Sequence, residues 1–323
     1  KAADARSTDE SQRLADYYLT IAPALQAQRE QLAKVRQQLA EMKPYTTVPV
    51  MRDVAADQRR TTKIQLRGNY LVTTDEVTQG VPEVFHDIPE GESLDRMALA
   101  KWLVADENPL TARVTVNRFW AEIFGQGIVS TPEDFGMQSA SPSHPELLDW
   151  LALEFVRQGW SIKTIVKTMV MSSTYRQTAA VPSAVVAKDP SNQLLCRGPR
   201  FRLSGELIRD NLLAISGLLS DKIGGPSVYP PQPDGLWEEI SGADIKVYPT
   251  SKGEDRYRRG LYTFLRRGNP NPMLLNFDGS NRSACVVKRD RSNTPVQALS
   301  LLNGPTFVDA AHALADSLDR GQR

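Results

Sequence analysis

Apolar side chains follow a regular helical pattern near the start of the chain. Between residues 10 and 43 they recur at alternating spacings of four and three, with one polar member, at Leu14, Tyr18, Ile21, Leu25, Gln28, Leu32, Val35, Leu39 and Met42. This heptad spacing predicts a long coiled-coil-like helix within residues 1–44, and Pro23 predicts a kink or a new helix start. The seam either contacts a preceding domain or subunit, or lies on its own domain.

Residues 45–92 show no sustained helical pattern. Polar and apolar side chains alternate from Lys63 to Tyr70, which is typical of a half-buried strand that ends in a Gly-Asn turn. Pro82, Pro89 and Gly91 interrupt the stretch that follows. We therefore expect an extended connector that contains one short strand.

Residues 93–323 carry repeated helix signals and predict a helical domain. Capping residues or prolines open the successive apolar stretches, at Ser93, Asn108-Pro109, Ser143 or His144-Pro145, Ser161, Ser204, Thr294-Pro295 and Gly304-Pro305. In the helix after Ser204, the apolar spacing predicts an inner face made of Ile208, Leu212, Ile215 and Leu219. Residues 221–255 are rich in Gly, Pro and polar side chains and predict long loops. The fold class is mainly α with a few short β-strands.

Composition excludes several classes of protein. With 41% hydrophobic and 24% charged residues the chain is typical of a globular protein, and no window is apolar enough to span a bilayer. The net charge of +1 gives no reason to expect a nucleic acid partner. Two cysteines, three histidines and no CxxCH motif predict neither a cysteine-rich metal site nor a haem attached to this chain.

Positive charge is nevertheless concentrated between residues 252 and 291. Ten lysines and arginines stand there against four acidic residues, with aromatic residues between them. Forked guanidinium groups suit sulfate, phosphate or carboxylate ligands, and they equally suit ion pairs inside the protein. The candidate binding residues of this stretch are Tyr257, Arg258, Arg259, Arg266, Arg267, Arg282, Arg289 and Arg291.

A polar stripe lies on the helix that follows Asn108-Pro109. Arg113, Asn117 and Trp120 share one face at helical spacing. A guanidinium and a carboxamide beside an apolar face need partners, because burial without hydrogen bonds costs several kcal/mol. The expected partners are the carboxylates of Asp134, Asp149 and Asp210. The stripe is either a hydrogen-bonded lattice that holds loops on helices or the floor of an active site.

His144 is the candidate for a general base. Glu146 and Asp149 follow it at the start of the same predicted helix, and either carboxylate could orient the imidazole in a hydrolase. No nucleophile-elbow motif accompanies His144, and no second histidine lies at metal-ligand spacing. A helix cap or loop anchor is the alternative role.

Longer motifs resemble those of a known family, the planctomycete-specific C-terminal domain of unknown function found in cytochrome-c-associated proteins. The resemblance covers about residues 45–320, and its motifs are residues 96–103, 108–120, 124–129, 134–136, 143–151, 173–176, 209–217, 259–262 and 293–303. The family has no established activity, so the resemblance implies no catalytic residue. It does place the following residues in family-typical motifs: Arg113, Asn117, Arg118, Asp134, His144, Asp149, Arg209, Asp210 and Asn293.

The resemblance also implies a setting for the chain. Members of the family commonly follow another planctomycete-specific domain and often a c-type cytochrome module, in proteins expected to be exported to the periplasm or cell surface. Residues 1–44 would then form the junction with the preceding domain, and any haem would lie in an attached module.

Taken together, these features favour a non-catalytic accessory or binding module, with a polyanionic or sulfated glycan as its candidate ligand. A hydrolase of polysaccharides or esters that uses His144 is one alternative. A structural subunit that assembles through the N-terminal helix is the other.

Overall fold

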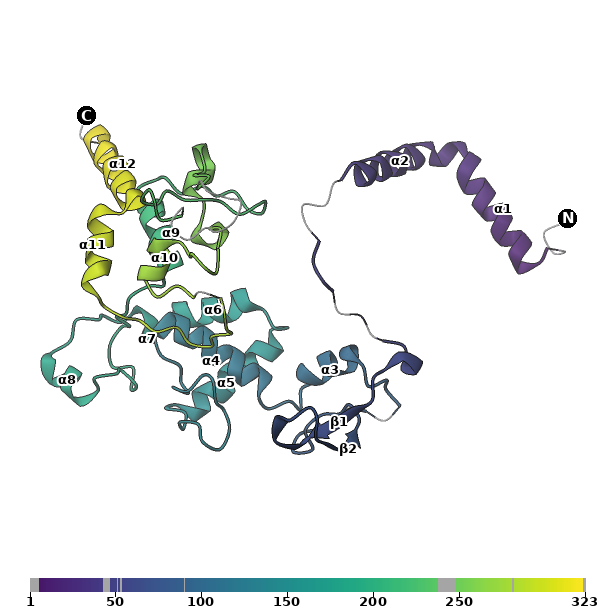
Figure 1. Cartoon of the computed structure of the whole chain (residues 1–323), viewed down its shortest axis with the longest axis horizontal. Helices are drawn as coiled ribbons and strands as arrows, with labels where there is room; N and C mark the ends of the chain where they lie inside the picture. The colour runs from purple at the N-terminus through teal and green to yellow at the C-terminus, as the bar shows by residue number, and fades with distance from the viewer. Residues whose placement is uncertain are drawn as a thin grey trace. The chain divides into compact units, whose positions relative to one another are not determined.

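The computed structural model describes residues 6–42, 47–50, 52, 54–89, 91–237, 248–280 and 282–321. Over these residues the chain is mainly helical with one pair of short strands, as predicted, and it divides into two compact units, residues 1–79 and 80–323 (Figure 1). Residues 238–247 of the predicted loop region and residues 43–46 at the predicted helix end lie outside this description. None of the described helices combines the length and hydrophobicity that a membrane span requires.

In the first unit, the predicted long helix is divided into two. Helix α1 (Thr8–Ile21) opens with a capping box between Ser7 and Glu10, and α2 (Gln26–Glu41) follows a 3₁₀ turn (Pro23–Leu25). The predicted break at Pro23 is therefore confirmed. The Arg29 guanidinium donates to the carbonyl oxygen of Ala22 at 2.7 Å, which satisfies a backbone group at the break.

The heptad seam is exposed on both helices. Leu14, Leu32, Val35 and Leu39 keep between 46% and 67% of their surface accessible. An apolar stripe of this kind is typical of a contact surface. Assembly through the seam therefore stays a prediction.

A strand lies where the alternation from Lys63 predicted one, but it is exposed rather than half-buried. Strands β1 (Thr62–Gln65) and β2 (Thr73–Val77) pair antiparallel, with Thr62 opposite Val77, and every position in both is exposed. A 3₁₀ turn (Leu66–Gly68) lies between them, and a further short turn (Ala56–Gln58) precedes them. Two strands do not by themselves form a layered core, so Ile64 remains 48% exposed.

The second unit opens with α3 (Arg96–Leu103). Its N-cap is Asp95, not the predicted Ser93, because the Asp95 carboxylate directly precedes the first turn. Asp95 Oδ1 accepts from the backbone amides of Met97 at 2.8 Å and Ala98 at 3.0 Å. These hydrogen bonds, chiefly the one from Ala98, lower the pKa of the Asp95 carboxyl.

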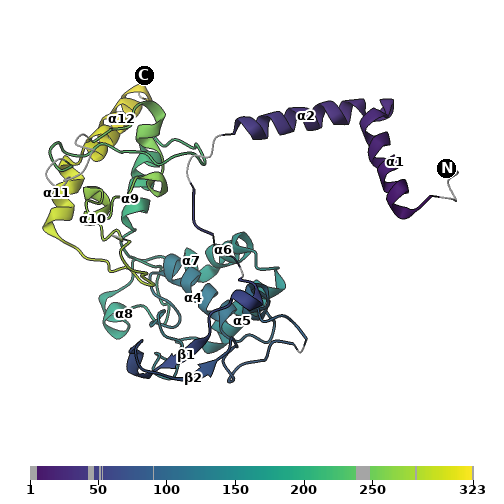
Figure 2. The same cartoon turned by 45° about the vertical axis from the view of Figure 1, so that its right-hand side comes forward.

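Three amphipathic helices form the apolar core of this unit. Helices α4 (Thr111–Phe124), α5 (Pro145–Arg157) and α6 (Ile162–Met171) pack against one another (Figures 1 and 2). The N-cap of α4 is Leu110, not the predicted Asn108, whose Oδ1 accepts from the backbone amides of Leu110 and Thr111 just before the helix; Gly125 ends the helix at a φ of 87°. Val116, Ile165 and Leu151 are among the most deeply buried side chains of the cluster.

The helices that follow the core are mostly shorter. They are α7 (Ser173–Arg176), α8 (Ser183–Lys188), α9 (Gly205–Ile215), α10 (Pro272–Asn276), α11 (Pro295–Asn303) and α12 (Pro305–Gly321), with 3₁₀ turns at Gly253–Tyr257 and Gly260–Tyr262. Helix α9 packs on α10, α12 and the second of these turns, and α11 joins α10 and α12. The capping box between Thr294 and Gln297 opens α11 as the Thr-Pro signal predicts.

The inner face of α9 differs from the predicted one. Ile208 and Leu212 are only half-buried and Ile215 is 62% exposed, whereas Arg209 and Leu213 are buried. The buried face of α9 is therefore rotated by about one residue from the predicted face. The apolar pattern was misleading because the helix buries a guanidinium group whose acceptors come from distant parts of the chain.

Candidate functional site

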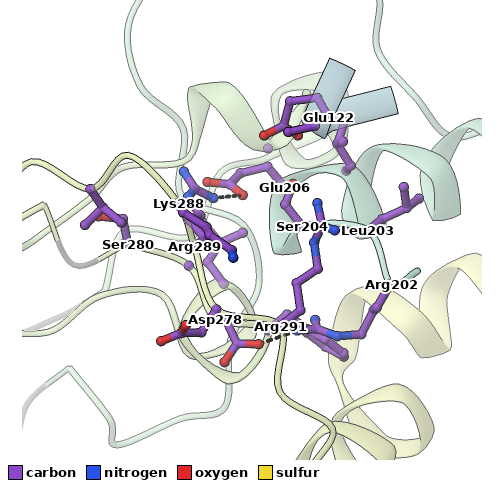
Figure 3. A pocket seen from close by; sticks show the side chains of 18 of the residues that line it. Glu122, Arg202, Leu203, Ser204, Glu206, Asp278, Ser280, Lys288, Arg289 and Arg291 are labelled. Carbon is purple, nitrogen blue, oxygen red and sulfur yellow. Dashed lines mark hydrogen bonds and ion pairs between the residues drawn. The ribbon is translucent and has the colours of Figure 1, made fainter. Parts of the chain in front are cut away.

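A concavity in the described part of the second unit has a volume of about 700 Å³ and is rich in charged side chains. Its walls come from α4, from the start of α9 and from residues 278–291 (Figure 3). We name it the basic pocket. Its cationic side chains are Arg118, Arg202, Arg259, Arg282, Lys288, Arg289 and Arg291, and its acidic ones are Glu122, Glu206, Asp210, Asp278 and Asp290.

Helix α4 supplies one wall because of its amphipathic pattern. Arg118 and Glu122 are exposed one turn apart, whereas Val116 and Trp120 of the same helix are buried. Gly125 ends the helix where the ring of Phe201 comes so close that a Cβ at position 125 would lie 2.7 Å from the ring. Arg291 extends over this ring and donates to the Gly125 carbonyl oxygen at 2.9 Å. The end of α4 is thereby tied to the segment that forms the opposite wall.

Several of the pocket's charges neutralise one another. Arg289 binds Glu206 at 2.7 Å, and Arg259 binds Asp210 at 3.1 Å. The second Asp210 oxygen accepts from the backbone amide of Gly260 at 2.6 Å. Partial burial by itself raises the pKa of Glu206, but the hydrogen bond and charge of Arg289, together with the charge of Arg282, lower it below its usual value.

Asp278 is the most heavily hydrogen-bonded carboxylate of the pocket. It forms an ion pair with Arg202 (Figure 3), and it accepts from the backbone amide of Ser292 at 2.8 Å and from the Ser292 hydroxyl. Burial opposes ionisation here, but the Ser292 hydrogen bonds and the Arg202 charge together lower the pKa of Asp278. These contacts hold residues 278 and 292 together at the pocket wall.

Three cations of the pocket form no hydrogen bond or ion pair with another described residue. The side chains of Arg118, Arg282 and Lys288 are exposed and make no hydrogen bond or ion pair with any residue that the structure describes. Arg118 comes from α4 and the other two from the 278–291 segment, so they approach the cavity from separate walls. Glu122 and Asp290 are likewise without such a partner among the described residues, so the free charge of the pocket is mixed but mainly positive.

Two of the predicted binding residues are structural instead. Arg209 is 1% exposed and donates to the carbonyl oxygens of Arg258 at 3.3 Å and Arg256 at 2.8 Å, and to the hydroxyl of Thr306 at 3.3 Å. Burial lowers the pKa of Arg209 to about 10, because the surroundings disfavour the charged form.

Arg258 is fully buried and organises the Gly/Pro-rich loop. Its guanidinium donates to the carbonyl oxygens of Pro226 and Lys222, each at 3.2 Å, and to that of Gly224. It also stacks over the ring of Tyr262, 3.7 Å from the centroid. The guanidinium groups of Arg209 and Arg258 thus make their hydrogen bonds within the protein.

The polar stripe on α4 forms a lattice. Arg113 binds Asp149 at 2.7 Å, which is one of the predicted partners. Asn117 is fully buried and exchanges two hydrogen bonds with the backbone of Val129, at 2.9 and 3.0 Å. Asp134 accepts from the backbone amide of Gly136 in its own loop at 2.7 Å. These contacts hold loops on the helical core.

The remaining predicted binding residues lie outside the basic pocket. Arg266 stacks over Trp237 at 5.0 Å from the ring centroid, and the ring of Tyr257 contacts Arg256. Arg267 and Asn293 are exposed, and neither lines the pocket.

The three candidate catalytic residues form no hydrogen bond or ion pair with one another in the described structure. His144 directly precedes α5, and its Nδ1 lies 3.0 Å from the hydroxyl of Ser143. The Asp149 carboxylate binds Arg113, and no hydrogen bond connects His144 with Asp149 or Glu146. None of the three lines the basic pocket, and the described residues contain no cluster of metal-ligating side chains.

Half of the charged side chains that line the basic pocket were not singled out by the sequence analysis. Glu122, Arg202, Glu206 and Asp278 were not among the candidates, and Lys288 was noticed only as part of the basic stretch. The four-residue spacing of Arg118 and Glu122 was a visible signal for a shared exposed face. Nothing local could place Arg202 against Asp278, since 76 residues separate them.

A family comparison extends this picture. The family model described as PSD1, protein of unknown function (DUF1553), matches residues 95–323. The chain belongs to this family. The resemblance seen in the motifs is thereby confirmed as membership of a family of unknown function, although the match begins at residue 95 rather than near residue 45. Neither curated proteins nor solved structures gave a match.

Membership covers the basic pocket, since its walls lie between residues 118 and 291. Family membership assigns no activity to any residue of the pocket. The restriction to planctomycetes, the association with cytochromes and the export of the protein remain predictions from the motifs.

Proposed function

We propose that this member of the family is a non-catalytic binding module that holds an anionic polymer, a sulfated or carboxylated glycan, in the basic pocket. The observation that carries the proposal is the set of three cations, Arg118, Arg282 and Lys288, that face one cavity without a hydrogen-bonding partner among the described residues. In the setting that the resemblance implies, the module would accompany a c-type cytochrome module in an exported protein.

The arrangement of these cations favours a ligand over internal pairing. The other four cationic side chains of the pocket bind carboxylates or a carbonyl of the protein, so the fold satisfies the charges it needs. An exposed guanidinium can donate two parallel hydrogen bonds to one sulfate or carboxylate, and an ammonium supplies a point charge. Two arginines and one lysine on opposite walls thus suit a chain that bears successive anionic groups.

The pocket's own carboxylates limit what binds. Glu122 and Asp290 repel a ligand with anions on every side, and they can accept hydrogen bonds from sugar hydroxyls. A volume of about 700 Å³ is within the range of ordinary ligand pockets, and it accommodates a few sugar units. A glycan with spaced anionic groups therefore fits better than a densely charged polymer.

The test is a pair of charge-matched double variants. Arg118→Ala/Lys288→Ala removes two of the three free cations, whereas Lys163→Ala/Lys167→Ala removes two exposed lysines of α6 that line none of the pockets. Affinity for κ-carrageenan oligosaccharides and for hyaluronan, in which charged and uncharged units alternate, is measured by titration at several salt concentrations. We expect the pocket variant to bind on the order of tenfold more weakly, with a smaller salt dependence, because each free cation interacts with the ligand through a screened charge.

The control variant should bind as the unchanged protein does. Equal weakening in both double variants would show that only the overall charge matters, and would overturn the proposal. Unchanged binding in the pocket variant, with an unchanged unfolding temperature, would do the same.

A further inference from the structure

A second, smaller cavity adjoins the basic pocket and is chemically different from it. Its volume is about 80 Å³, and none of its lining residues, all of them described, carries a charge. Hydroxyl and carboxamide groups dominate its rim, and two aromatic side chains reach it from the end of α4. We name it the hydroxyl pocket.

Much of the rim's hydrogen-bonding capacity is unused. The side chains of Ser130, Ser141, Ser191, Gln126 and Gln193 make no hydrogen bond with a described residue. Each hydroxyl and each carboxamide can both donate and accept. A neutral ligand that itself bears several hydroxyl groups is the chemical complement of such a rim.

The aromatic side of the cavity adds an apolar contact. Trp120 and Phe124 stack with their ring centroids 3.9 Å apart and their planes 17° from parallel. Both are largely buried, at 5% and 8% exposure, so only small parts of the rings face the cavity. Sugar rings combine carbon–hydrogen edges with hydroxyl groups, and a site of mixed aromatic and polar character matches both properties.

The two cavities are neighbours on either side of the chain that follows α4. Gln126, Gly127 and Ser130 line both of them, so one short segment forms the boundary between the basic pocket and the hydroxyl pocket. For one ligand to occupy both, a polymer anchored by its anionic group in the basic pocket has to pass over this segment to place its next unit in the hydroxyl pocket. The small volume admits the hydroxyl-bearing edge of a ring, not an enclosed ring, because a single water molecule already occupies roughly 30 Å³ of liquid.

We propose that the hydroxyl pocket is a subsite for an uncharged sugar unit next to the anionic unit held by Arg118, Arg282 and Lys288. The inference rests on the proposed function and makes it more specific. The ligand class is a glycan in which charged and uncharged units alternate. A polymer with a charge on every unit places an anion where the structure offers only neutral hydrogen-bonding groups.

The experiment compares two probes on the full chain. Oligosaccharides of κ-carrageenan alternate a sulfated and an uncharged sugar unit, and inorganic polyphosphate carries a charge on every unit and no sugar at all. Ser141→Ala/Gln193→Ala removes two unpartnered groups of the rim, and Gln138→Ala/Ser139→Ala makes the same exchanges at positions that line neither cavity. Affinities are measured by calorimetric titration at constant salt.

We expect the rim variant to bind the oligosaccharide on the order of tenfold more weakly and polyphosphate unchanged, because it loses hydrogen bonds to neutral hydroxyls without a change in charge. The control variant should match the unchanged protein on both probes. Equal affinities of the rim variant and the unchanged protein for the oligosaccharide would overturn the subsite. So would an equal loss for both probes.

The failure of the proposed function is separately recognisable. If Arg118→Ala/Lys288→Ala binds both probes as well as the unchanged protein does, then the basic pocket is not the anion site. Gln193→Glu is a further check that does not depend on a loss of packing. The carboxylate keeps the volume of the side chain, but it replaces the amide donor by a negative charge that repels an anionic glycan in the rim, so oligosaccharide binding should weaken. An unaffected Gln193→Glu variant would contradict the subsite even where the double variant failed to fold.

Discussion

The core of helices α4–α6 and the region around α9 bury their side chains by different means. In the α4–α6 core, apolar groups such as Phe155 and Ile165 contact one another. Around α9, the two largest fully buried side chains are Arg209 and Arg258, whose guanidinium groups bind backbone carbonyls. The first region gains stability by removing apolar surface from water, and the second by satisfying polar groups that would otherwise be buried unpaired.

The buried guanidinium of Arg258 also bears on the basic pocket, because the next residue in the chain lines that pocket. Arg258 binds carbonyls that lie 32 to 36 residues earlier in the chain, and the next residue, Arg259, binds Asp210 at the pocket. The side chain of Arg258 thus points into the fold, and that of Arg259 points toward the cavity. A buried arginine can hold loops where no helix or strand supplies the hydrogen bonds.

The largest expected effect is in the apolar core. Phe155→Ala should lower the free energy of unfolding by about 3–5 kcal/mol, because it removes a buried ring that packs against Phe119 and Trp160 and leaves a cavity. Chemical denaturation would measure this loss of free energy, provided that the variant and the unchanged protein have the same m-value. A loss below about 1 kcal/mol would show that the core is not closely packed here.

A somewhat smaller effect is expected in the region held by arginine. Arg258→Met keeps much of the side-chain volume but leaves the carbonyls of Lys222, Gly224 and Pro226 without their donor, at a cost of about 2–3 kcal/mol. Arg258→Lys should recover part of this, since an ammonium cannot reach all three carbonyls.

Arg267→Met is the matched control for Arg258→Met, because Arg267 is exposed and has no hydrogen bond or ion pair among the described residues. It should change stability by less than about 0.5 kcal/mol. If Arg258→Met proved equally harmless in denaturation, the loop would not depend on the buried guanidinium, and the contrast between the two regions would fail.

The smallest expected effect is a pH dependence located in the basic pocket. The folded-state pKa values of Glu206 and Asp278 are lowered from reference values of 4.5 and 3.8. Their contribution to stability is therefore present above those reference values, and it is lost as the pH falls through the lowered ones. We expect about 1 kcal/mol for each ion pair.

Glu206→Gln/Asp278→Asn should flatten the loss of stability between pH 5 and pH 2 relative to the unchanged protein, as measured by urea denaturation across that range. Asp290→Asn is the control, because Asp290 lines the same pocket without an ion pair in the described structure. A control variant that flattened the profile to the same degree would place the pH dependence outside these two ion pairs.

Local signals in the sequence were sufficient for much of the helical architecture. The break at Pro23 and the start of α11 after Thr294 each depend on a few neighbouring residues, so they could be predicted. The family could likewise be inferred from motifs within residues 95–323. The first strand of the exposed β-hairpin was placed correctly, but neither its partner β2 nor its exposure was predicted, because both depend on what pairs with it and packs against it.

The sequence by itself determined where the helices lie and where positive charge is concentrated. Only the tertiary structure decided which charges pair inside the fold and which have no partner among the described residues. Arg202 meets Asp278 across 76 residues, and Arg289 meets Glu206 across 83. Helix signals act within one or two turns, whereas an ion pair depends on two surfaces brought together by the folding of everything between them.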